Sequence, residues 1–171
     1  DSPYAPNFKI VSKPNEWTRS IRASKQKLTA WDSTRLEYWT AFNEYINSNN
    51  VKINNRKPHT GHWYDVAMGI SGAHFTFTMR GQKQDIACEL YIDGADAKEL
   101  FQHLEADANE IEKIIGGEME WHELPTKKAS RIIYREKIDP ADESKWHNAF
   151  EWYSMIIRKF REAFTERVKG F

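Results

Sequence analysis

The sequence contains a single cysteine and lacks long apolar runs. One cysteine excludes a disulfide framework and a zinc site built from cysteines. No apolar stretch approaches the roughly 20 residues that span a bilayer, and no signal-peptide core is present. Walker A, G-x-G-x-x-G and G-x-S-x-G motifs are also missing. We therefore expect a cytoplasmic protein with no membrane partner.

The chain also has no net charge, since 25 basic side chains balance 25 acidic ones. This balance argues against a histone-like polycation. The charges are unevenly distributed: residues 85–123 hold twelve acids and two bases, whereas residues 124–171 hold eleven bases and seven acids. A basic surface formed by the second segment would attract phosphate, although a solvated surface of interleaved charges would give the same counts.

The chain has enough apolar residues to form one hydrophobic core. Of its 171 residues, 40% are apolar and 13% aromatic, including seven Trp. Such a composition excludes a disordered chain. Three prolines within residues 1–14 block regular structure, and residues 17–27 form a short basic segment that could be helical. We expect an N-terminal arm or linker over residues 1–31 and a single domain over residues 32–171, and the missing initiator Met indicates a fragment or processed form.

Hydrophobic periodicity predicts an α+β fold. Thr34 and Glu37 have capping-box spacing, and period-3.6 and period-2 stretches alternate along the chain. The predicted elements are a helix over 34–47, strands over 62–70, 73–80 and 85–92, a helix over 93–115, strands around Trp121 and over 130–138, and a helix over 143–168. We expect a mostly antiparallel five-stranded sheet, a three-stranded meander plus a strand pair, with three main helices in the order α-βββ-α-ββ-α.

The alternation also assigns faces to the strands. Phe75 and Phe77 share one face with Leu90 and Ile92, so the helices over 93–115 and 143–168 should cover that face. Trp121 should be largely buried beneath the helix over 93–115.

Three groups of reactive side chains do not form a catalytic or metal site. Asp85, Glu89 and Tyr91 point outward on one strand, but a PD-(D/E)xK nuclease needs Lys where Tyr91 stands. We interpret these residues as a solvated or cross-strand-paired face. Cys88 alternates with core residues, so it should be buried. The histidines at 59, 62 and 74 span a loop and two strands, without further cysteines to complete a metal site. We expect no catalytic residue, metal or cofactor.

A binding surface is the remaining candidate. Aromatic side chains stack on bases, while Lys and Arg hold phosphates. The residues that combine these chemistries are Arg56, Lys57, Trp63, Arg80, Tyr91, Lys127, Lys128 and Arg131. They predict contact with DNA or RNA. The alternative is that the Trp and Tyr side chains serve in the core and at its rim.

Several sequence segments together resemble a known family. They are KPNEWTRS, LEYWTAFNEYI, GHWYDVAMGISG, CELYIDGADAKELFQHL and IEKIIGGEMEWHELPTKKASRI. They are similar to an uncharacterised C-terminal domain of bacterial and archaeal proteins, which often follows a restriction-endonuclease-like PD-(D/E)xK region. The similarity runs from about Pro14 to Val168. It implies a prokaryotic origin and a nuclease-like partner domain, but it transfers no catalytic residues.

These observations leave three functions open. The favoured one is a non-catalytic accessory or recognition module of a nuclease-like defence or DNA-processing protein, in which any nuclease activity would belong to another region of the full-length protein. The second is a protein-binding or oligomerisation module without nucleic-acid contact. The third is a small-molecule or nucleotide sensor with a pocket between the helix over 34–47 and the meander. The oligomeric state stays open.

Overall fold

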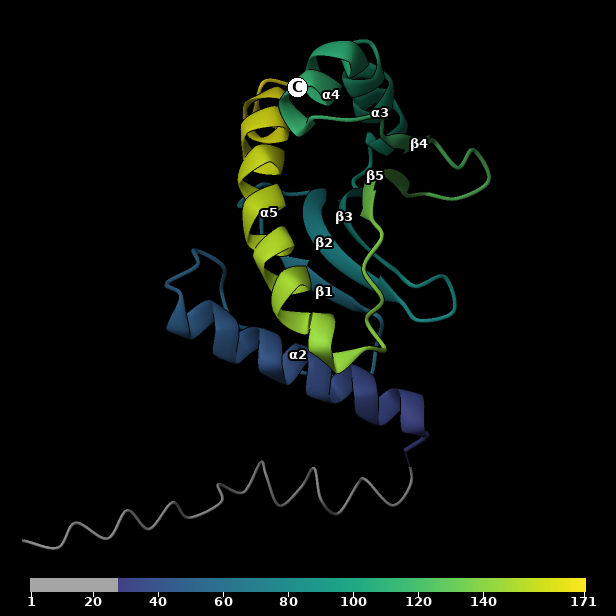
Figure 1. Cartoon of the computed structure of the whole chain (residues 1–171). Coiled ribbons are helices and arrows are strands. Elements are labelled where there is room, and N and C mark those ends of the chain that lie inside the picture. The colour runs from purple at the N-terminus through teal and green to yellow at the C-terminus, as the bar shows by residue number, and fades with distance from the viewer. Residues whose placement is uncertain (1–27) are drawn as a thin grey trace, which may run out of the picture.

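The structure is a computed structural model that describes residues 28–171 (Figure 1). The segment over 17–27 that was predicted as a possible helix lies outside these residues. The elements in chain order are α2 (Ala30–Ser48), β1 (Trp63–Val66), β2 (Ala73–Arg80), β3 (Asp85–Ile92), α3 (Ala97–Glu105), α4 (Ala108–Ile115), β4 (Glu120–His122), β5 (Ser130–Glu136), the 3-10 turn η2 (Glu143–Lys145) and α5 (Trp146–Lys169). Within the described part of the chain, no helix is long and apolar enough to cross a membrane.

The strands form one open, antiparallel sheet in the order β1-β2-β3-β5-β4. This arrangement confirms the predicted α+β fold with a meander and a strand pair. β2 and β3 begin and end at the residues that the alternation predicted. β1 does not, since it ends at Val66 and the chain continues through a loop over 67–72 to β2. Gly69 and Gly72 in that loop have φ values of 79° and 81°, which favour glycine and end regular pairing.

The helices cover one face of the sheet, and α5 runs along its length (Figure 1). The ring of Tyr153 stacks on that of Phe77 with centroids 4.4 Å apart, and Phe160 meets Phe75 edge-on at 5.9 Å. α2 crosses the end of the same face, where Phe42 contacts Tyr64 at 5.1 Å. All these rings are buried. The prediction that helices cover the Phe75 and Phe77 face is confirmed, and the opposite face carries no helix from residues 28–171.

The prediction of a single helix over 93–115, and hence of three main helices, was wrong. The chain turns at Ala106 and Asp107, so α3 and α4 are separate and the described part has four α-helices. The Asp107 carboxylate accepts a hydrogen bond from Arg167 Nε of α5 at 2.5 Å, which ties the turn to the neighbouring helix. Leu104 and Ile111 are both fully buried on either side of the turn. Apolar spacing therefore continues across the break and conceals it.

α2 begins earlier than its predicted cap at Thr34. Thr29 and Asp32 form the capping box, since Thr29 Oγ1 accepts from Asp32 N at 3.1 Å and Asp32 Oδ2 accepts from Thr29 N at 3.2 Å. The earlier start places Trp31 in the helix, where it packs against the core. A Cβ at Gly81 would lie 2.2 Å from the Trp31 ring, so only glycine fits in this turn between β2 and β3.

Trp121 is half-buried instead of largely buried. The predicted packing against the 93–115 segment is confirmed. The centroids of the Trp121 and Phe101 rings lie 6.1 Å apart, and Trp121 Nε1 donates to Glu112 Oε1 of α4 at 3.0 Å. β4 is an edge strand of three residues. No further strand from residues 28–171 lies beyond it, so the Trp121 side chain stays partly exposed.

Candidate functional site

The face of the sheet that no described helix covers, here called the open face, gathers polar and aromatic side chains from four strands. The register places His74, Tyr91 and Arg131 side by side on β2, β3 and β5. One row further along, Asp65 and Thr76 follow on β1 and β2. Because alternate residues of a strand point to opposite faces, every one of these side chains is on the open face.

A hollow of about 300 Å³ lies at the middle of this face. We call it the central hollow. It combines aromatic rings, imidazoles, carboxylates and one guanidinium. The residues that line it are His62, Trp63, Asp65, His74, Thr76, Glu89, Tyr91 and Arg131.

Glu89 is the most deeply buried charged group of the central hollow. Its side chain is 2% exposed, and Oε1 accepts a hydrogen bond from Arg131 Nη2 at 2.9 Å. Burial raises the pKa of the Glu89 carboxyl above its ordinary value, although the charge of Arg131 acts in the opposite direction. A buried carboxyl with a perturbed pKa in a hollow is a frequent mark of a functional site.

Arg131 connects Glu89 to the aromatic wall. Its guanidinium carbon lies 5.5 Å from the centre of the Tyr91 ring, a cation–π distance. The Tyr91 ring in turn lies 5.2 Å from that of His74. Arg131 Nε is buried and has no hydrogen-bond partner among residues 28–171. One donor of the guanidinium is therefore buried and unsatisfied.

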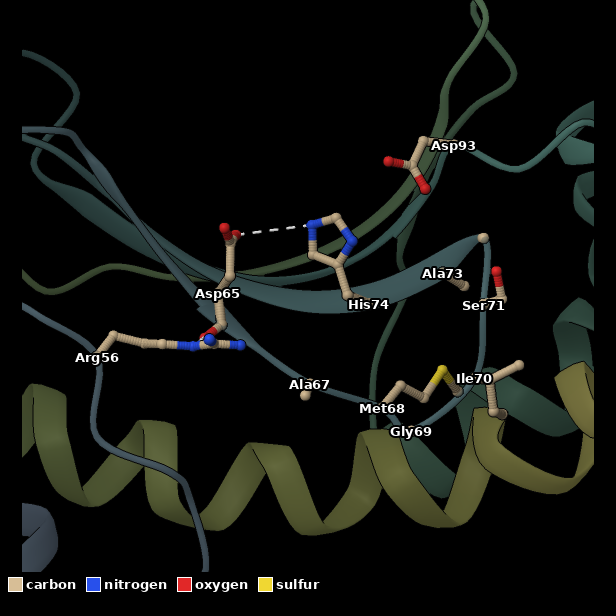
Figure 2. A pocket seen from close by; sticks show the side chains of 11 residues that line it. Arg56, Asp65, Ala67, Met68, Gly69, Ile70, Ser71, Ala73, His74 and Asp93 are labelled. Carbon is tan, nitrogen blue, oxygen red and sulfur yellow. Dashed lines mark hydrogen bonds and ion pairs between the residues drawn. The ribbon is translucent and has the colours of Figure 1, made fainter.

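Asp65 and His74 form the border with a second, outer hollow of about 520 Å³ (Figure 2). His74 Nε2 lies 3.6 Å from Asp65 Oδ1, which also accepts from Thr76 Oγ1 at 3.0 Å. Figure 2 shows both side chains rising from the side of the sheet away from the underlying helix. Arg56 lines this hollow as well, and its Nε donates to the backbone oxygen of Asp65 at 3.1 Å. This hydrogen bond holds the Arg56 guanidinium at the edge of the sheet.

A third hollow of about 430 Å³ lies at the loop between β4 and β5, and we call it the loop hollow. Lys127, Lys128 and Arg131 line it together with Tyr91. Lys98 of α3 holds this loop in place, since its Nζ donates to the carbonyl oxygens of three loop residues and to Ser130 Oγ. The acceptors are Glu123, Leu124 at 2.9 Å, Ala129 at 2.9 Å and Ser130 at 3.0 Å.

The three hollows are continuous with one another. The central and outer hollows share Asp65 and His74, and the central and loop hollows share Tyr91 and Arg131. Six of the eight residues predicted from the sequence thus lie on one surface. They are Arg56, Trp63, Tyr91, Lys127, Lys128 and Arg131. Their binding of nucleic acid stays a prediction.

The other two predicted residues do not line these three hollows. Lys57 is exposed in the loop next to Arg56 and is not among the residues that line the three hollows. Arg80 is at the far end of β2, where its Nε and Nη2 bind the Asp85 carboxylate at 2.7 and 2.5 Å. It lines a further hollow of about 770 Å³ between Trp31 of α2 and the β2–β3 turn, which shares His62 with the central hollow.

The sequence interpretation missed the polar centre of the site. Glu89 had been interpreted as solvated or cross-strand paired; the pairing is confirmed through Arg131, but the side chain is buried. The sequence favours surface or hydrogen-bonded histidines over metal ligands, but it does not indicate that His74 lines a hollow. In residues 28–171 no group of three or more His, Cys, Asp or Glu side chains is placed to hold a metal ion. Strand alternation places Glu89 and His74 on one face, yet no local pattern reveals a hollow built from four strands.

Comparisons with known proteins give a family but no function. A family profile described as a domain of unknown function matches residues 34–168, from the first turns of α2 to the last turn of α5. No curated protein and no solved structure matches the chain. The profile therefore spans the strands and loops that build the open face.

Proposed function

The chain belongs to the family described as a domain of unknown function, DUF4268, and we propose that its open face is a recognition surface for single-stranded nucleic acid. The observation that carries this proposal is the gathering of aromatic rings and cationic side chains on a sheet face that no described helix covers. In this proposal the domain is a non-catalytic accessory module of a cytoplasmic, prokaryotic, nuclease-like protein, with a PD-(D/E)xK region elsewhere in the full-length chain.

The aromatic rings favour single strands over duplexes. Trp63 is 43% exposed, which is unusual for the largest apolar side chain, and Tyr91 is partly exposed within the same hollow. An exposed ring on a sheet face can stack on an unpaired base, whereas the faces of bases in a duplex are already stacked on their neighbours.

The cations around the hollows are placed for the phosphates of such a strand. Lys127 and Lys128 are exposed on the loop that Lys98 holds, so their charge is available to a ligand. Two of the acids on this surface have partners, since Glu89 binds Arg131 and Asp65 accepts from Thr76, whereas Asp93 is exposed beside the loop hollow. These contacts reduce the repulsion that the carboxylates would exert on a phosphate backbone.

The accessory role agrees with the chemistry of the strands. A PD-(D/E)xK centre requires a lysine two residues after its second acid. In β3 the residue two positions after Glu89 is Tyr91, whose ring is engaged with Arg131. The sequence resemblance described above supplies the expected nuclease-like neighbour.

Fluorescence anisotropy with labelled single-stranded oligonucleotides at two salt concentrations tests the proposal. We expect replacement of Lys127 and Lys128 by Ala to weaken binding and to flatten the log–log salt dependence by about 0.7 for each lost phosphate contact. Trp63→Ala should weaken single-strand binding by roughly 1–3 kcal/mol per stacked base, and it should leave duplex binding unchanged.

Matched controls come from the helical side of the molecule. Lys113 on α4 and Arg158 on α5 are exposed, and their joint replacement by Ala removes the same charge as the loop double variant. Phe171→Ala removes an aromatic side chain that is 53% exposed. Absence of wild-type binding at low salt, or equal losses in the control variants, would overturn the proposal. Concentration-dependent light scattering would then test the protein-binding alternative.

A further inference from the structure

The buried carboxylate of the central hollow points to a specific ligand. We propose that this hollow binds one unpaired guanine base, with Glu89 accepting the two adjacent N–H groups of its Watson–Crick edge. The inference depends on the proposed single-strand binding and names the base that the open face selects.

Glu89 has the capacity for this contact. Among residues 28–171 its hydrogen-bond donor is Arg131, through Oε1. An ionised carboxylate offers about four lone-pair sites on two oxygens, so most of its acceptor capacity remains unused. A ligand that supplies N–H donors can use this capacity through charge-assisted hydrogen bonds. Glu89 is among the residues that line the hollow, and 2% of its side chain is exposed there.

The donor pattern of guanine fits two parallel carboxylate oxygens. Guanine presents N1–H and N2–H side by side, whereas the other bases present a single N–H or a single amino group at that edge. The guanine O6 atom is an acceptor next to these donors. Arg131 lies beside Glu89 with a side chain that is 37% exposed, so the exposed part of its guanidinium can donate to O6. Hydrogen bonds to ionised groups are the stronger ones.

The neighbouring hollow suits the phosphate of the same nucleotide. Tyr91 and Arg131 line both the central and the loop hollow. The backbone of a base held at Glu89 can therefore reach the adjoining loop hollow, which Lys127 and Lys128 line. Trp63, which is 43% exposed, supplies a ring face in the hollow that receives the base.

A cationic ligand is the competing occupant, because aromatic rings around a carboxylate also attract ammonium groups. Here the cation position is already filled. The Arg131 guanidinium lies over the Tyr91 ring and binds Glu89. Lys127 and Lys128 at the adjoining hollow would repel a further positive charge. The charges thus favour an anionic strand with a neutral base.

The experiment uses dT oligonucleotides that carry one central guanine, inosine, adenine or cytosine, with binding measured by anisotropy. Inosine keeps N1–H and O6 but lacks the N2 amino group. We expect the wild-type protein to prefer guanine over inosine by about tenfold, the effect of one charge-assisted hydrogen bond. Glu89→Gln should remove this preference and retain binding to the dT background. Glu162→Gln, which removes an exposed acid of α5 on the helical side of the molecule, should retain the preference.

Each outcome separates the two proposals. If the wild-type protein binds none of the oligonucleotides, both proposals fail. Both also fail if the protein binds a trimethyllysine peptide and none of the oligonucleotides. If all four central bases bind equally, only the guanine assignment fails. A preference that persists in folded Glu89→Gln overturns the role of Glu89. The guanine–inosine comparison needs no variant, so a folding defect in Glu89→Gln leaves the assignment open to refutation.

Discussion

Two acids of β3 are buried on the same face of the sheet but differ in how their neighbours satisfy them. Asp85 is bound by two nitrogens of Arg80. Burial would raise the pKa of Asp85, but the hydrogen bonds and charge of Arg80 outweigh it and hold that pKa below its ordinary value. Glu89 is bound by one nitrogen of Arg131, and burial there keeps the pKa raised. The first acid is a structural ion pair; the second retains capacity for a ligand.

This difference predicts opposite pH dependences. Because the folded pKa of Glu89 is raised above its ordinary 4.5, the stability it contributes is fully present below pH 4.5 and is lost as pH rises through the folded pKa. Glu89→Gln should therefore gain stability relative to wild type between pH 4.5 and neutrality, as measured by urea unfolding. Asp85→Asn should lose stability relative to wild type above pH 3.8, the ordinary value of Asp85, and the loss should shrink in acid. Parallel pH profiles for Glu89→Gln and wild type would refute the first expectation.

At the scale of elements, the loop between β4 and β5 owes its shape to one lysine on another element. Lys98 binds carbonyl groups at both ends of the loop and the hydroxyl of Ser130. Leu124, one of the acceptors, has a φ of 53°, which a non-glycine residue adopts only when its surroundings hold it. The position of Lys127 and Lys128 therefore depends on α3.

Lys98→Met keeps the length of the side chain and removes its donors. We expect it to destabilise the domain by about 1–3 kcal/mol, because several carbonyl groups lose a charged partner. Hydrogen exchange should show faster exchange of the loop amides, and the single-strand affinity should fall towards that of the Lys127 and Lys128 double variant. Lys113→Met, at an exposed lysine of α4, is the control. Unchanged loop exchange in Lys98→Met would contradict the anchoring role.

The helices and strands also show which parts of the fold local sequence patterns can predict. Alternation defined β2 and β3 to the residue, because both strands are central and each has one face in the core. Periodicity failed where a contact distant in sequence determines the end of a helix. At Asp107 the turn between α3 and α4 is bound by Arg167 of α5. Six site residues were predicted from their chemistry. Glu89 was not recognised, since its burial depends on Arg131, 42 residues away, and on rings from other strands.

At the scale of the whole molecule, Tyr153 joins the layers. From α5 it donates a hydrogen bond to the backbone oxygen of Thr78 in β2 at 3.0 Å, and it accepts one from Tyr38 of α2 at 3.3 Å. Both hydroxyls are buried, and burial raises the pKa of Tyr153 well above its ordinary value. The two helices and the sheet thus share one chain of hydrogen bonds within one core.

Removing either hydroxyl should affect this core unequally. Tyr153→Phe leaves the buried Tyr38 hydroxyl without its acceptor, so we expect a loss of about 1–3 kcal/mol. Tyr38→Phe removes only the end of the chain and should cost less, about 0.5–1.5 kcal/mol. Urea unfolding followed by tryptophan fluorescence and by circular dichroism should give one common midpoint for each variant. Separate midpoints, or equal losses in the two variants, would contradict this account.

The sheet ends in very short strands, β1 with four residues and β4 with three. A long, flat edge strand offers a row of unpaired amide and carbonyl groups, which is a template for adding a strand from another chain and for amyloid-like growth. These two edges offer only a few such groups. Self-association by edge-to-edge pairing is therefore disfavoured, and the protein can expose a sheet face to solvent without the aggregation that exposed sheets invite.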